Sequence, residues 1–492
     1  MTLIFNGQDF KYEIESVVKL FLPVVHFDFL YENSADSVIG DYCLCEREIS
    51  DNTAKLHSEC RLNGETASFY NEISVDTLNF DGECEISLCS MLFKCLEKLT
   101  GKKVGWGTLT GVRPVKRVNK MISQGMTKNQ IKDELKNRFL LSDEKCEIAY
   151  KTAKTQQNIV NRIDDKAFAL YVSIPFCPSR CSYCSFVSQE VEKSLDLIPK
   201  YVYCLCREIE KTGEIATSLG LKLQSVYFGG GTPTSLEAPY LKTIMEAVKN
   251  SFDMSGVLEY TVEAGRADTI TEDKLLTIKE MGADRVSINP QTLNNDVLKE
   301  IGRKHTVEDF FDKYNLARKI GFKTINTDLI AGLPTDTTDS FKNTIDGIVS
   351  LSPENVTVHT LSVKRTSNIN VNGEYQVLDN PACEMVDYAT KILSESGYNP
   401  YYLYKQKNML DNLENIGWSI PGHESLYNVY IMEEIQTILA VGAGASTKLV
   451  DNKNSRLERI FNYKLPLEYI KNFDLMLEKK DDIERFYNFE KE

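Results

Sequence analysis

Apolar and polar residues alternate along much of the first 95 residues. The stretches DYCLCEREI and TAKLHSECRL carry apolar residues at roughly every second position, and Asn, Asp and Gly residues separate them from their neighbours. A period of two is typical of strands that bury one face and expose the other. The pattern therefore predicts a β-rich or α+β domain over residues 1–95.

The spacing of apolar residues lengthens from about residue 86. The segments ISLCSMLFKCLEKL, RPVKRVNKMI and TKNQIKDELKNRFL follow the period of an amphipathic helix. Thr127 opens the third segment, where its hydroxyl can cap the first helical turn. We expect a helical connector over residues 96–163.

From Phe168 onward, short β-rich runs alternate with segments that suit helices. The six runs are FALYVSI, LQSVYFG, LEYTVEA, DRVSINP, KTINTDL and NVTVHTL. Strands separated by helices pair in parallel, so the predicted fold is α/β, with a partial (β/α)6 barrel over residues 164–397. In such barrels the functional residues lie at the C-terminal ends of the strands, because the loops that follow the strands meet there.

The remaining residues, 398–492, are predicted to elaborate this barrel. YYLYKQKNML, PGHESLYNVYIM and TILAVGAGAST are rich in aromatic residues and glycine, and the final residues are charged. We expect a further α+β layer beside the barrel, followed by a charged helix or tail. The expected architecture is thus an N-terminal α+β and helical extension, a barrel and a C-terminal elaboration.

The composition limits which binding partners and which cellular compartment are expected. The 492 residues include 57 Lys and Arg against 71 Asp and Glu, a net charge of -14, which disfavours nucleic acid as a partner because phosphate contacts require a basic surface. No run of about 18 apolar residues suggests a membrane span, and the N-terminus lacks the zones of a signal peptide. We therefore expect a cytoplasmic protein with no membrane partner. Its 13 cysteines are expected to be thiols or metal ligands, not disulfides.

Three cysteines follow the first predicted barrel strand at a spacing that suits an iron–sulfur cluster. In YVSIPFCPSRCSYCSF, Cys177, Cys181 and Cys184 form a C-x3-C-x2-C pattern. Thiolates are the usual ligands of such clusters, and three ligands leave one iron of a [4Fe–4S] cluster open to a substrate or cosubstrate. The alternatives are three chance buried cysteines or a zinc site, but no second Cys or His pair stands at the spacing of a zinc site.

Two further cysteine pairs, Cys43 with Cys45 and Cys204 with Cys206, have one residue between their members. Their strand-like and helix-like surroundings favour ordinary buried thiols. An auxiliary cluster at one of these pairs is the less favoured alternative.

A glycine-rich loop, GGGTP, ends the second predicted barrel strand. Glycines at a strand end allow the backbone to approach a ligand closely. Together with the cysteine motif, this loop resembles the radical S-adenosylmethionine (SAM) superfamily, which implies a [4Fe–4S] cluster and SAM as cofactors. The resemblance also implies that the loop holds the methionyl amino group of SAM through Gly229, Gly230, Gly231 and Thr232.

The resemblance becomes narrower over roughly residues 168–450. YVSIPFC, YFGGGTPT, NPQTLNNDVLKEIGRKHT and NTDLIAGLP resemble the oxygen-independent coproporphyrinogen III dehydrogenase group of haem biosynthesis, and GVRPVKRVNK resembles its HemZ branch. The group implies that a 5′-deoxyadenosyl radical derived from SAM starts the decarboxylation of two propionates of coproporphyrinogen III to vinyl groups. It also implies a tetrapyrrole substrate and a reducing partner such as flavodoxin or ferredoxin.

The same resemblance implies roles for single residues at the barrel mouth. Tyr171, which is taken as catalytic, and Tyr183 flank a first SAM molecule, and Gly230 and Glu263 hold it. A second set lines a second SAM site, so that one or two molecules bind. This second set consists of Gln291, Arg303, Asp328 and, with a weaker alignment, Ser362.

The positions of these residues relative to the predicted strands are consistent with these roles. Glu263, Gln291 and Asp328 each close an apolar strand, so their polar groups are expected at the barrel mouth and not in its packed interior. Arg303 can bind a carboxylate through two hydrogen bonds. The alternatives are that Glu263 and Asp328 cap the following helices and that Arg303 forms a surface ion pair.

At two positions this sequence has a different residue from the best-known catalytic branch. These differences leave a second function as an alternative. That branch has a His at the position of Ser173 and a Cys at the position of Phe186, while the related haem-chaperone branch also has an aromatic residue at the second position. The alternative function is a haem-binding or haem-delivery protein. His423 is a candidate ligand for it, although a structural role is favoured for a lone His. A radical SAM enzyme that modifies RNA is disfavoured by the acidic composition.

A basic stretch precedes the barrel. Its cations can bind the carboxylates of a tetrapyrrole, but a solvated helix face is the favoured interpretation. The stretch comprises Lys102, Lys103, Arg113, Lys116, Arg117 and Lys120.

Overall fold

In the computed structural model, the strands form two large sheets, each in its own unit of the chain. The structure describes residues 1–23, 25–32, 35, 38–161, 163–362, 381–406 and 409–488. One unit comprises residues 1–151 with Asp411–Leu413, and the other comprises residues 152–410 and 414–492. Among the described residues, no helix is both long enough and apolar enough to cross a membrane.

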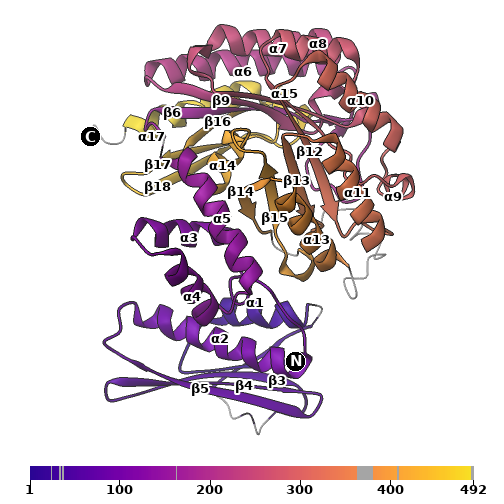
Figure 1. The fold of residues 1–492 in the computed structure, drawn as a ribbon. Helices are drawn as coiled ribbons and strands as arrows, with labels where there is room; N and C mark the ends of the chain where they lie inside the picture. Colours follow the sequence, from indigo (N-terminus) through magenta and orange to yellow (C-terminus); the bar gives the residue numbers. More distant parts are fainter. Residues whose placement is uncertain are drawn as a thin grey trace. The chain divides into compact units, whose positions relative to one another are not determined.

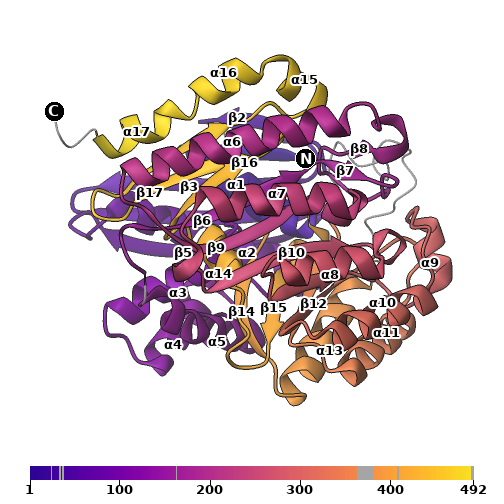
Figure 2. The ribbon, with the colours of Figure 1, turned by 90° about the horizontal axis from the view of Figure 1, so that it is seen from above.

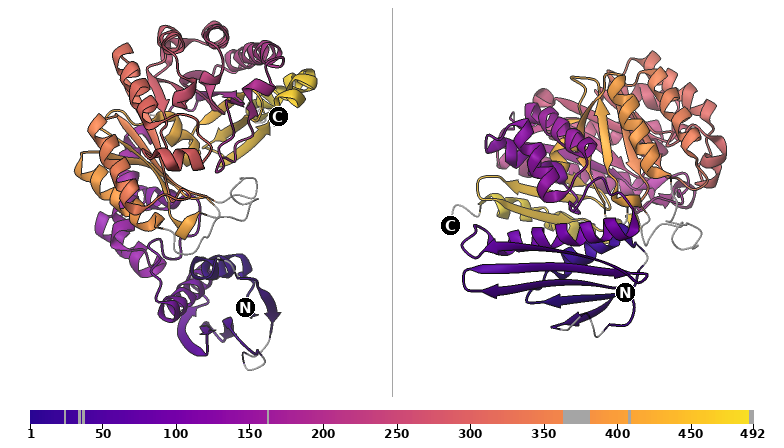
Figure 3. Two further views of the ribbon diagram at one scale, coloured as in Figure 1. Left: turned by 90° about the vertical axis from the view of Figure 1, so that its right-hand side faces the viewer. Right: turned by 60° about the horizontal axis from the view of Figure 1, so that its bottom comes forward.

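The first unit is built on a mixed sheet with two long helices. Its elements are β1 (Thr2–Asn6), α1 (Lys11–Phe21), β2 (Asp28–Tyr31), β3 (Tyr42–Ser50), β4 (Thr53–Leu62), β5 (Glu65–Ser74) and α2 (Phe80–Thr100). The strand order is β2-β1-β3-β4-β5, and β3, β4 and β5 are antiparallel. The two alternating stretches of the sequence are β3 and β4. Figure 3 shows the strands of this unit side by side, with the helices over one face.

The core of the first unit lies between this sheet and its helices. Val17 of α1 and Leu88 and Leu92 of α2 pack there with Cys43 and Cys60 of the sheet. Helix α2 begins at Phe80 and packs its apolar side against the sheet. The expected domain boundary at residue 95 therefore falls inside a helix that packs on this sheet.

Three further helices follow, namely α3 (Pro114–Ser123), α4 (Lys128–Phe139) and α5 (Asp143–Val160). The hydroxyl of Thr127 accepts a hydrogen bond from the backbone N–H of Gln130, and the side chain of Gln130 accepts one from the backbone N–H of Thr127. This capping box satisfies donors that the first turn of a helix leaves unpaired. Thr127 therefore starts α4, as the sequence predicts.

The second unit contains a parallel barrel sheet, and the expected α/β fold with a partial (β/α)6 barrel is confirmed. Its parallel strands are β6 (Ala167–Ile174), β9 (Lys222–Gly230), β10 (Glu259–Gly265), β11 (Arg285–Ile288), β12 (Thr324–Ala331) and β13 (Asn355–Thr360). The helices that follow them are α6 (Ile198–Ser218), α7 (Ala238–Ser251), α8 (Glu272–Glu280), α9 (Asn295–Glu300), α10 (Val307–Ile320) and α11 (Thr338–Leu351). Figures 1 and 2 show α6, α7 and α8 along the outer side of this sheet.

The chain after residue 397 extends both edges of the barrel sheet, which corrects the expectation of a separate layer. At one edge lie β14 (Asn399–Tyr404) and β15 (Asn415–Ser419), and at the other lie β16 (Thr437–Val441), β17 (Ser446–Asp451) and β18 (Arg456–Phe461). Strand β15 pairs antiparallel with β13, and β16 pairs parallel with β6. An open barrel leaves unpaired backbone groups on its first and last strands, and these additions pair them.

The remaining elements complete the second unit. They are the short strands β7 (Phe176–Cys177) and β8 (Gln189–Glu190) and the helices α13 (Ala382–Glu395), α14 (Leu426–Glu433), α15 (Pro466–Lys471), α16 (Phe473–Glu478) and α17 (Asp481–Asn488). The last three helices lie beside α6 (Figure 2). The segment that the sequence predicts to be a charged helix or tail is therefore packed against the barrel.

Candidate active site at the barrel mouth

One cavity of about 620 Å³ opens at the C-terminal ends of the barrel strands. Gly229 lies just beneath its wall, where a Cβ would stand 3.3 Å from Oε2 of Glu263. The structure thus brings every other sequence-predicted site residue to the wall of one cavity. These residues are Tyr171, Cys177, Cys181, Tyr183, Cys184, Gly230, Gly231, Thr232, Glu263, Gln291, Arg303, Asp328 and Ser362.

Cys177 ends β7, and Cys181 and Cys184 lie on the irregular loop between β7 and β8. The backbone N–H of Cys184 donates to the carbonyl of Cys181 at 3.1 Å, which turns the loop back on itself. Burial raises the pKa of Cys177 and raises that of Cys184 to about 11, and the neighbouring thiols add to both shifts. In the described part of the chain, no three His, Cys, Asp or Glu side chains are placed to hold a single metal ion.

The glycine loop closes the space beside the cysteines. A Cβ at Gly231 would lie 2.6 Å from the carbonyl oxygen of Phe176 and 3.0 Å from Sγ of Cys177, so only glycine fits there. Gly230 has a φ of 106°, a conformation that favours glycine. The Sγ of Cys177 also lies 3.6 Å from the hydroxyl of Thr232. Three sulfur donors beside a backbone that approaches them closely fit an iron–sulfur cluster with a small ligand.

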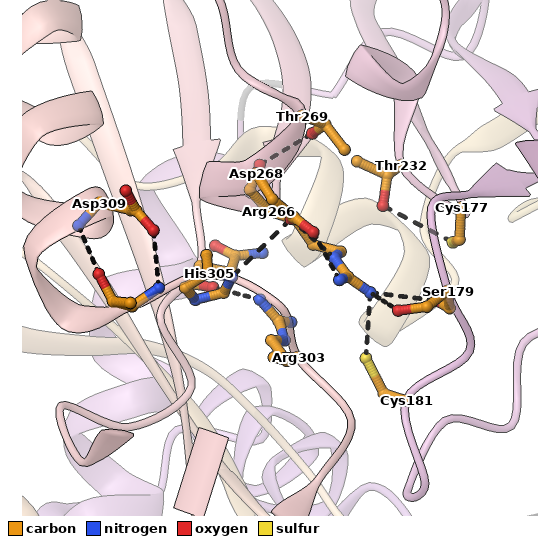
Figure 4. A network of polar contacts seen from close by, with 12 residues as sticks. Cys177, Ser179, Cys181, Thr232, Arg266, Asp268, Thr269, Arg303, His305 and Asp309 are labelled. Atoms are coloured by element: carbon orange, nitrogen blue, oxygen red, sulfur yellow. Dashed lines mark hydrogen bonds and ion pairs between the residues drawn. The ribbon is translucent and has the colours of Figure 1, made fainter. Parts of the chain in front are cut away.

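Arg266, which the sequence argument missed, ties the cysteine loop to the barrel (Figure 4). This buried guanidinium donates from Nη1 to the carbonyl and the hydroxyl of Ser179, both at 3.0 Å, and lies 3.7 Å from Sγ of Cys181. Its other nitrogens form a bidentate pair with Asp268 at 3.0 and 2.7 Å. The available signal was its position directly after the strand that carries Glu263.

Arg303 occupies the adjacent wall and is buried, so its interpretation as a surface ion-pair residue is wrong. Its guanidinium donates to the carbonyl of Asn289 at 2.7 Å and to the hydroxyl of Tyr183 at 3.0 Å. Its Nε has no hydrogen-bond partner among the described residues. Buried donors of this kind are usually satisfied, so the unpaired Nε supports a ligand at this wall.

His305 lies behind these two arginines, as Figure 4 shows. Its Nδ1 is 3.8 Å from Oδ1 of Asp268, which is too long for a hydrogen bond. Burial lowers the pKa of His305. Burial opposes ionisation of Asp268, but His305 and Arg266 outweigh it and hold the pKa of this carboxyl well below its usual range. The carboxylate is therefore a fixed negative charge that orients Arg266 toward the cysteine loop.

Glu263 sits below a group of stacked tyrosines. The hydroxyl of Tyr227 donates to Oε1 of Glu263, and the ring of Tyr227 stacks on Tyr427 with centroids 4.3 Å apart. Tyr171 stacks on both rings. Burial raises the pKa of Glu263 to about 7; the hydrogen bond from Tyr227 opposes this rise, and the charge of Asp328 adds to it.

Neither carboxylate caps a helix, which corrects that alternative for both. Helix α8 begins after Thr271 and α11 after Thr337. Asp328 instead accepts a hydrogen bond from the side chain of Asn326 at 2.8 Å and faces the cavity.

Gln291 has an unusual backbone and an unpaired side-chain oxygen. Its φ of 71° is uncommon for a residue other than glycine and costs free energy. Its backbone N–H donates to the carbonyl of Asp328, and its carbonyl accepts from the N–H of Ile330, both at 3.0 Å. Its buried Oε1 has no partner among the described residues. The backbone thus holds an amide oxygen that remains available for a ligand.

The far wall of the cavity comes from the aromatic C-terminal segments, which the sequence argument did not assign to the site. Tyr402 and Tyr404 of β14 stack with centroids 6.1 Å apart, and Tyr427 and Asn428 of α14 line the same wall. Because β14 joins the barrel sheet through β15, which pairs with β13, its residues reach the mouth of the barrel.

The other positions considered in the sequence have different surroundings. The hydroxyl of Ser173 donates to the carbonyl of Ala443 at 2.8 Å, which accounts for a Ser at this position, whereas Phe186 is exposed at the cavity rim. The ring of His423 lies 2.7 Å from the hydroxyl of Thr324 at the start of β12, at the end of the strand opposite the cavity. Cys43 and Cys45 are buried in the first unit, and Cys204 is buried on α6.

The family follows from this arrangement and from sequence similarity. The model of the radical SAM superfamily matches residues 171–348. The oxygen-independent coproporphyrinogen-III oxidase-like protein HemZ of Bacillus subtilis is 41% identical over 391 residues, which cover 78% of each chain. The chain belongs to the radical SAM superfamily. Within this superfamily, HemZ is a relative over most of the length of both chains.

The chain is also similar to a second curated protein and to one solved structure. The heme chaperone HemW of Lactococcus lactis is 30% identical over 65% of this chain and 80% of its own. The structure of coproporphyrinogen III oxidase HemN of Escherichia coli, a radical SAM enzyme, superposes with a TM-score of 0.51 at 22% identity, over 66% of this chain and 73% of the other. As a radical SAM protein, the chain takes a [4Fe–4S] cluster and SAM as its cofactors.

Proposed function

We propose that this radical SAM protein catalyses the oxygen-independent conversion of coproporphyrinogen III to protoporphyrinogen IX in haem biosynthesis. The observation that carries the proposal is that one cavity joins the cysteine loop, the glycine loop and the polar ends of three barrel strands. The similarity to HemZ, a coproporphyrinogen-III oxidase-like protein, supports the choice of substrate.

In this proposal, Cys177, Cys181 and Cys184 hold the cluster, and Arg266 offsets part of the negative charge of their thiolates. The glycine loop and Glu263 hold SAM. When bound, the two cofactors supply an electron and a SAM-derived 5′-deoxyadenosyl radical that removes a hydrogen atom from the substrate. The β-carbon of each propionate loses that hydrogen atom; the bond to the carboxylate then breaks to release CO2, one further electron passes to an external one-electron acceptor, and a vinyl group remains.

The protein positions the substrate and excludes water. Burial raises the pKa of Tyr171, so its phenol stays protonated and can donate a hydrogen bond into the cavity. The stacked rings of Tyr227 and Tyr427 provide an apolar wall that keeps water from a radical. Gln291, Arg303, Asp328 and Ser362 form the second polar group, which suits a second SAM molecule or a substrate propionate.

An anaerobic assay tests this function. Dithionite-reduced protein with SAM and coproporphyrinogen III is expected to release CO2 and form 5′-deoxyadenosine in proportion to it. Flavodoxin or ferredoxin should replace dithionite as the electron donor. Asp328→Ala and Arg303→Ala should slow CO2 release, because both groups face the cavity. Formation of 5′-deoxyadenosine without any CO2 from this substrate would show that another molecule is the substrate.

The haem-carrier alternative remains a second candidate because of the similarity to HemW. Of the five histidines, His359 lines the barrel cavity, so it replaces His423 as the candidate axial ligand. A carrier should bind haem stoichiometrically and lose its Soret band in His359→Ala. Equal haem spectra for His359→Ala and the parent protein, together with CO2 release, would exclude a carrier that uses this histidine.

A further inference from the structure

The first unit contains a cavity of its own, with a volume of about 870 Å³. Its walls come from α1, the start of α2, the loop before α3, α3 itself and the end of α4, all within that unit. The volume is in the range of sites for small molecules. No role for this cavity follows from the chemistry at the barrel mouth.

One wall of this cavity is cationic. Lys116, Arg117 and Lys120 are spaced i, i+1, i+4 on α3, and Arg113 directly precedes the helix. All four line the cavity. Within the described part of the chain, Lys116, Arg117 and Lys120 form no ion pair with a carboxylate. The opposite face of α3 is buried.

The distribution of charge along the sequence also makes this region cationic. The chain has a net charge of -14, yet no Asp or Glu occurs between Lys98 and Lys132. In addition, α2 and α3 both begin at this cavity, and neither has a side-chain cap. Uncapped helix starts carry a partial positive charge, although Pro114 at the start of α3 contributes no N–H donor. These features all favour an anionic ligand.

Part of the remaining wall is apolar, which limits the kind of anion. Val17, Ile86 and Leu109 form part of the wall, and the guanidinium of Arg117 lies 4.4 Å from the ring centroid of Phe139. Such a surface suits a flat, hydrophobic body and not a bare inorganic ion.

Two carboxylates complete the lining. Glu13 and Glu85, from α1 and α2, also face the cavity, and burial and their mutual repulsion raise the pKa of Glu85, although Arg117 lowers it. They offer acceptors to N–H groups of a ligand. Their presence also means that a ligand must place its anionic groups at α3 and its N–H groups on the other side.

We propose that this cavity binds an amphipathic polyanion, a flat apolar ring system that bears several carboxylate or phosphate groups. The anionic groups bind Lys116, Arg117 and Lys120, and the ring packs on the apolar wall. A porphyrin tetracarboxylate and a nucleoside triphosphate share this chemistry. The site is independent of decarboxylation in the barrel, so either proposal can fail without the other.

Fluorescence titration of the full-length protein with coproporphyrin III, the stable oxidised tetracarboxylate, tests the site. The double variant Lys116→Glu/Lys120→Glu should weaken binding by about tenfold or more, because each cation makes a charge-assisted hydrogen bond. The matched control is Lys55→Glu/Lys98→Glu, which changes the net charge of the same unit equally through two exposed lysines outside the cavity. This control should bind like the parent protein.

Three probes define the ligand. The tetramethyl ester of coproporphyrin keeps the ring and removes the charges, so it should not bind. ATP tests the phosphate source, and its displacement of coproporphyrin would assign phosphate as well as carboxylate groups to the site. Asp328→Ala separates this binding from any porphyrin bound at the barrel, because only barrel binding should respond to it.

Three results would overturn the proposal. They are equal affinities for the two double variants, binding of the ester as tight as that of the acid, and failure of both coproporphyrin and ATP to bind outside the barrel. If Lys116→Glu/Lys120→Glu does not fold, as judged by circular dichroism, Lys116→Gln/Lys120→Gln replaces it. Absence of CO2 release with intact α3-dependent binding would refute the dehydrogenase function alone.

Discussion

At the scale of single residues, the cysteine loop makes the most direct prediction. Replacing Cys177, Cys181 or Cys184 with Ala should abolish the brown absorbance and most of the iron after anaerobic reconstitution, because each variant leaves only two thiolate ligands. Cys204→Ala and Cys206→Ala serve as controls and should keep full iron and SAM cleavage. Full iron and sulfide in any one of the three loop variants would refute the ligand assignment.

Glu263 should make SAM binding depend on pH. Its pKa is raised to about 7 by burial, against the hydrogen bond from Tyr227 and with the help of Asp328. Below that pH the carboxyl is protonated and accepts hydrogen bonds poorly, so SAM affinity should increase between about pH 6 and pH 8. Calorimetric titration of the cluster-loaded protein measures this.

The matched variant Glu263→Gln keeps the shape and removes the titration. It should bind SAM about tenfold or more weakly above pH 7, because a charge-assisted hydrogen bond contributes about 1.5–3 kcal/mol. The pH dependence should be smaller in this variant, and any slope that remains belongs to the ligand. An identical slope in parent and variant would show that Glu263 does not control binding.

Arg266 should influence the midpoint potential of the cluster. Its Nη1 lies 3.7 Å from Sγ of Cys181, and donors near thiolate sulfur favour the more negative, reduced state of a cluster. Arg266→Lys should therefore lower the midpoint potential and speed iron loss to a chelator. Redox titration followed by electron paramagnetic resonance measures the first effect. Arg207→Lys, on the exposed face of α6, is the control, and matching potentials for both variants would contradict the role.

At the scale of elements, the C-terminal helices are attached to the barrel through one buried carboxylate. Glu208 of α6 accepts hydrogen bonds from the backbone of Gly442, from Asn462 and from Tyr469, and it pairs with Lys480 at 2.7 Å. Both members of the ion pair are fully buried. These contacts join β16, the chain after β18 and the last helices to one side of α6.

Removing one member of this pair should therefore be costly. Lys480→Met leaves a buried carboxylate without its cation and should lower the free energy of unfolding by about 3–5 kcal/mol, measured by chemical denaturation. The comparison variant is Arg485→Ala, which breaks an exposed pair with Asp482 and should cost at most about 1 kcal/mol. Similar losses for the two variants would mean that the buried pair does not hold the C-terminal helices.

The strands that pair with the two edges of the barrel sheet could not be predicted from the sequences of the edge strands. The runs that became β6 and β13 read as ordinary parallel strands in the sequence, and nothing in them specifies a partner on the open side. Those partners, β16 and β15, come from distant parts of the chain: paired residues are 269 positions apart in β6 and β16 and 58 to 64 positions apart in β13 and β15. They pair the backbone groups that an edge strand leaves unpaired. The same arrangement brings Tyr402, Tyr404 and Tyr427 to the cavity.

At the scale of the whole molecule, the sequence by itself determined the barrel, its six strands and the chemistry of the cysteine and glycine loops. These features depend on local patterns: the alternation of strand and helix periods, and ligand residues a few positions apart on one loop. The ends of parallel strands meet at one side of a barrel, so Glu263, Gln291 and Asp328 could be placed together without coordinates.

The tertiary structure alone decided the features that depend on residues far apart in the chain. It buried Arg303 beside Tyr183, placed Arg266 between Ser179 and Asp268, and left the Oε1 of Gln291 without a partner among the described residues. It also turned the basic stretch on α3 toward a cavity of the first unit. A local pattern shows which side of a helix or strand is apolar, but burial and hydrogen-bond partners depend on what the fold packs against that side.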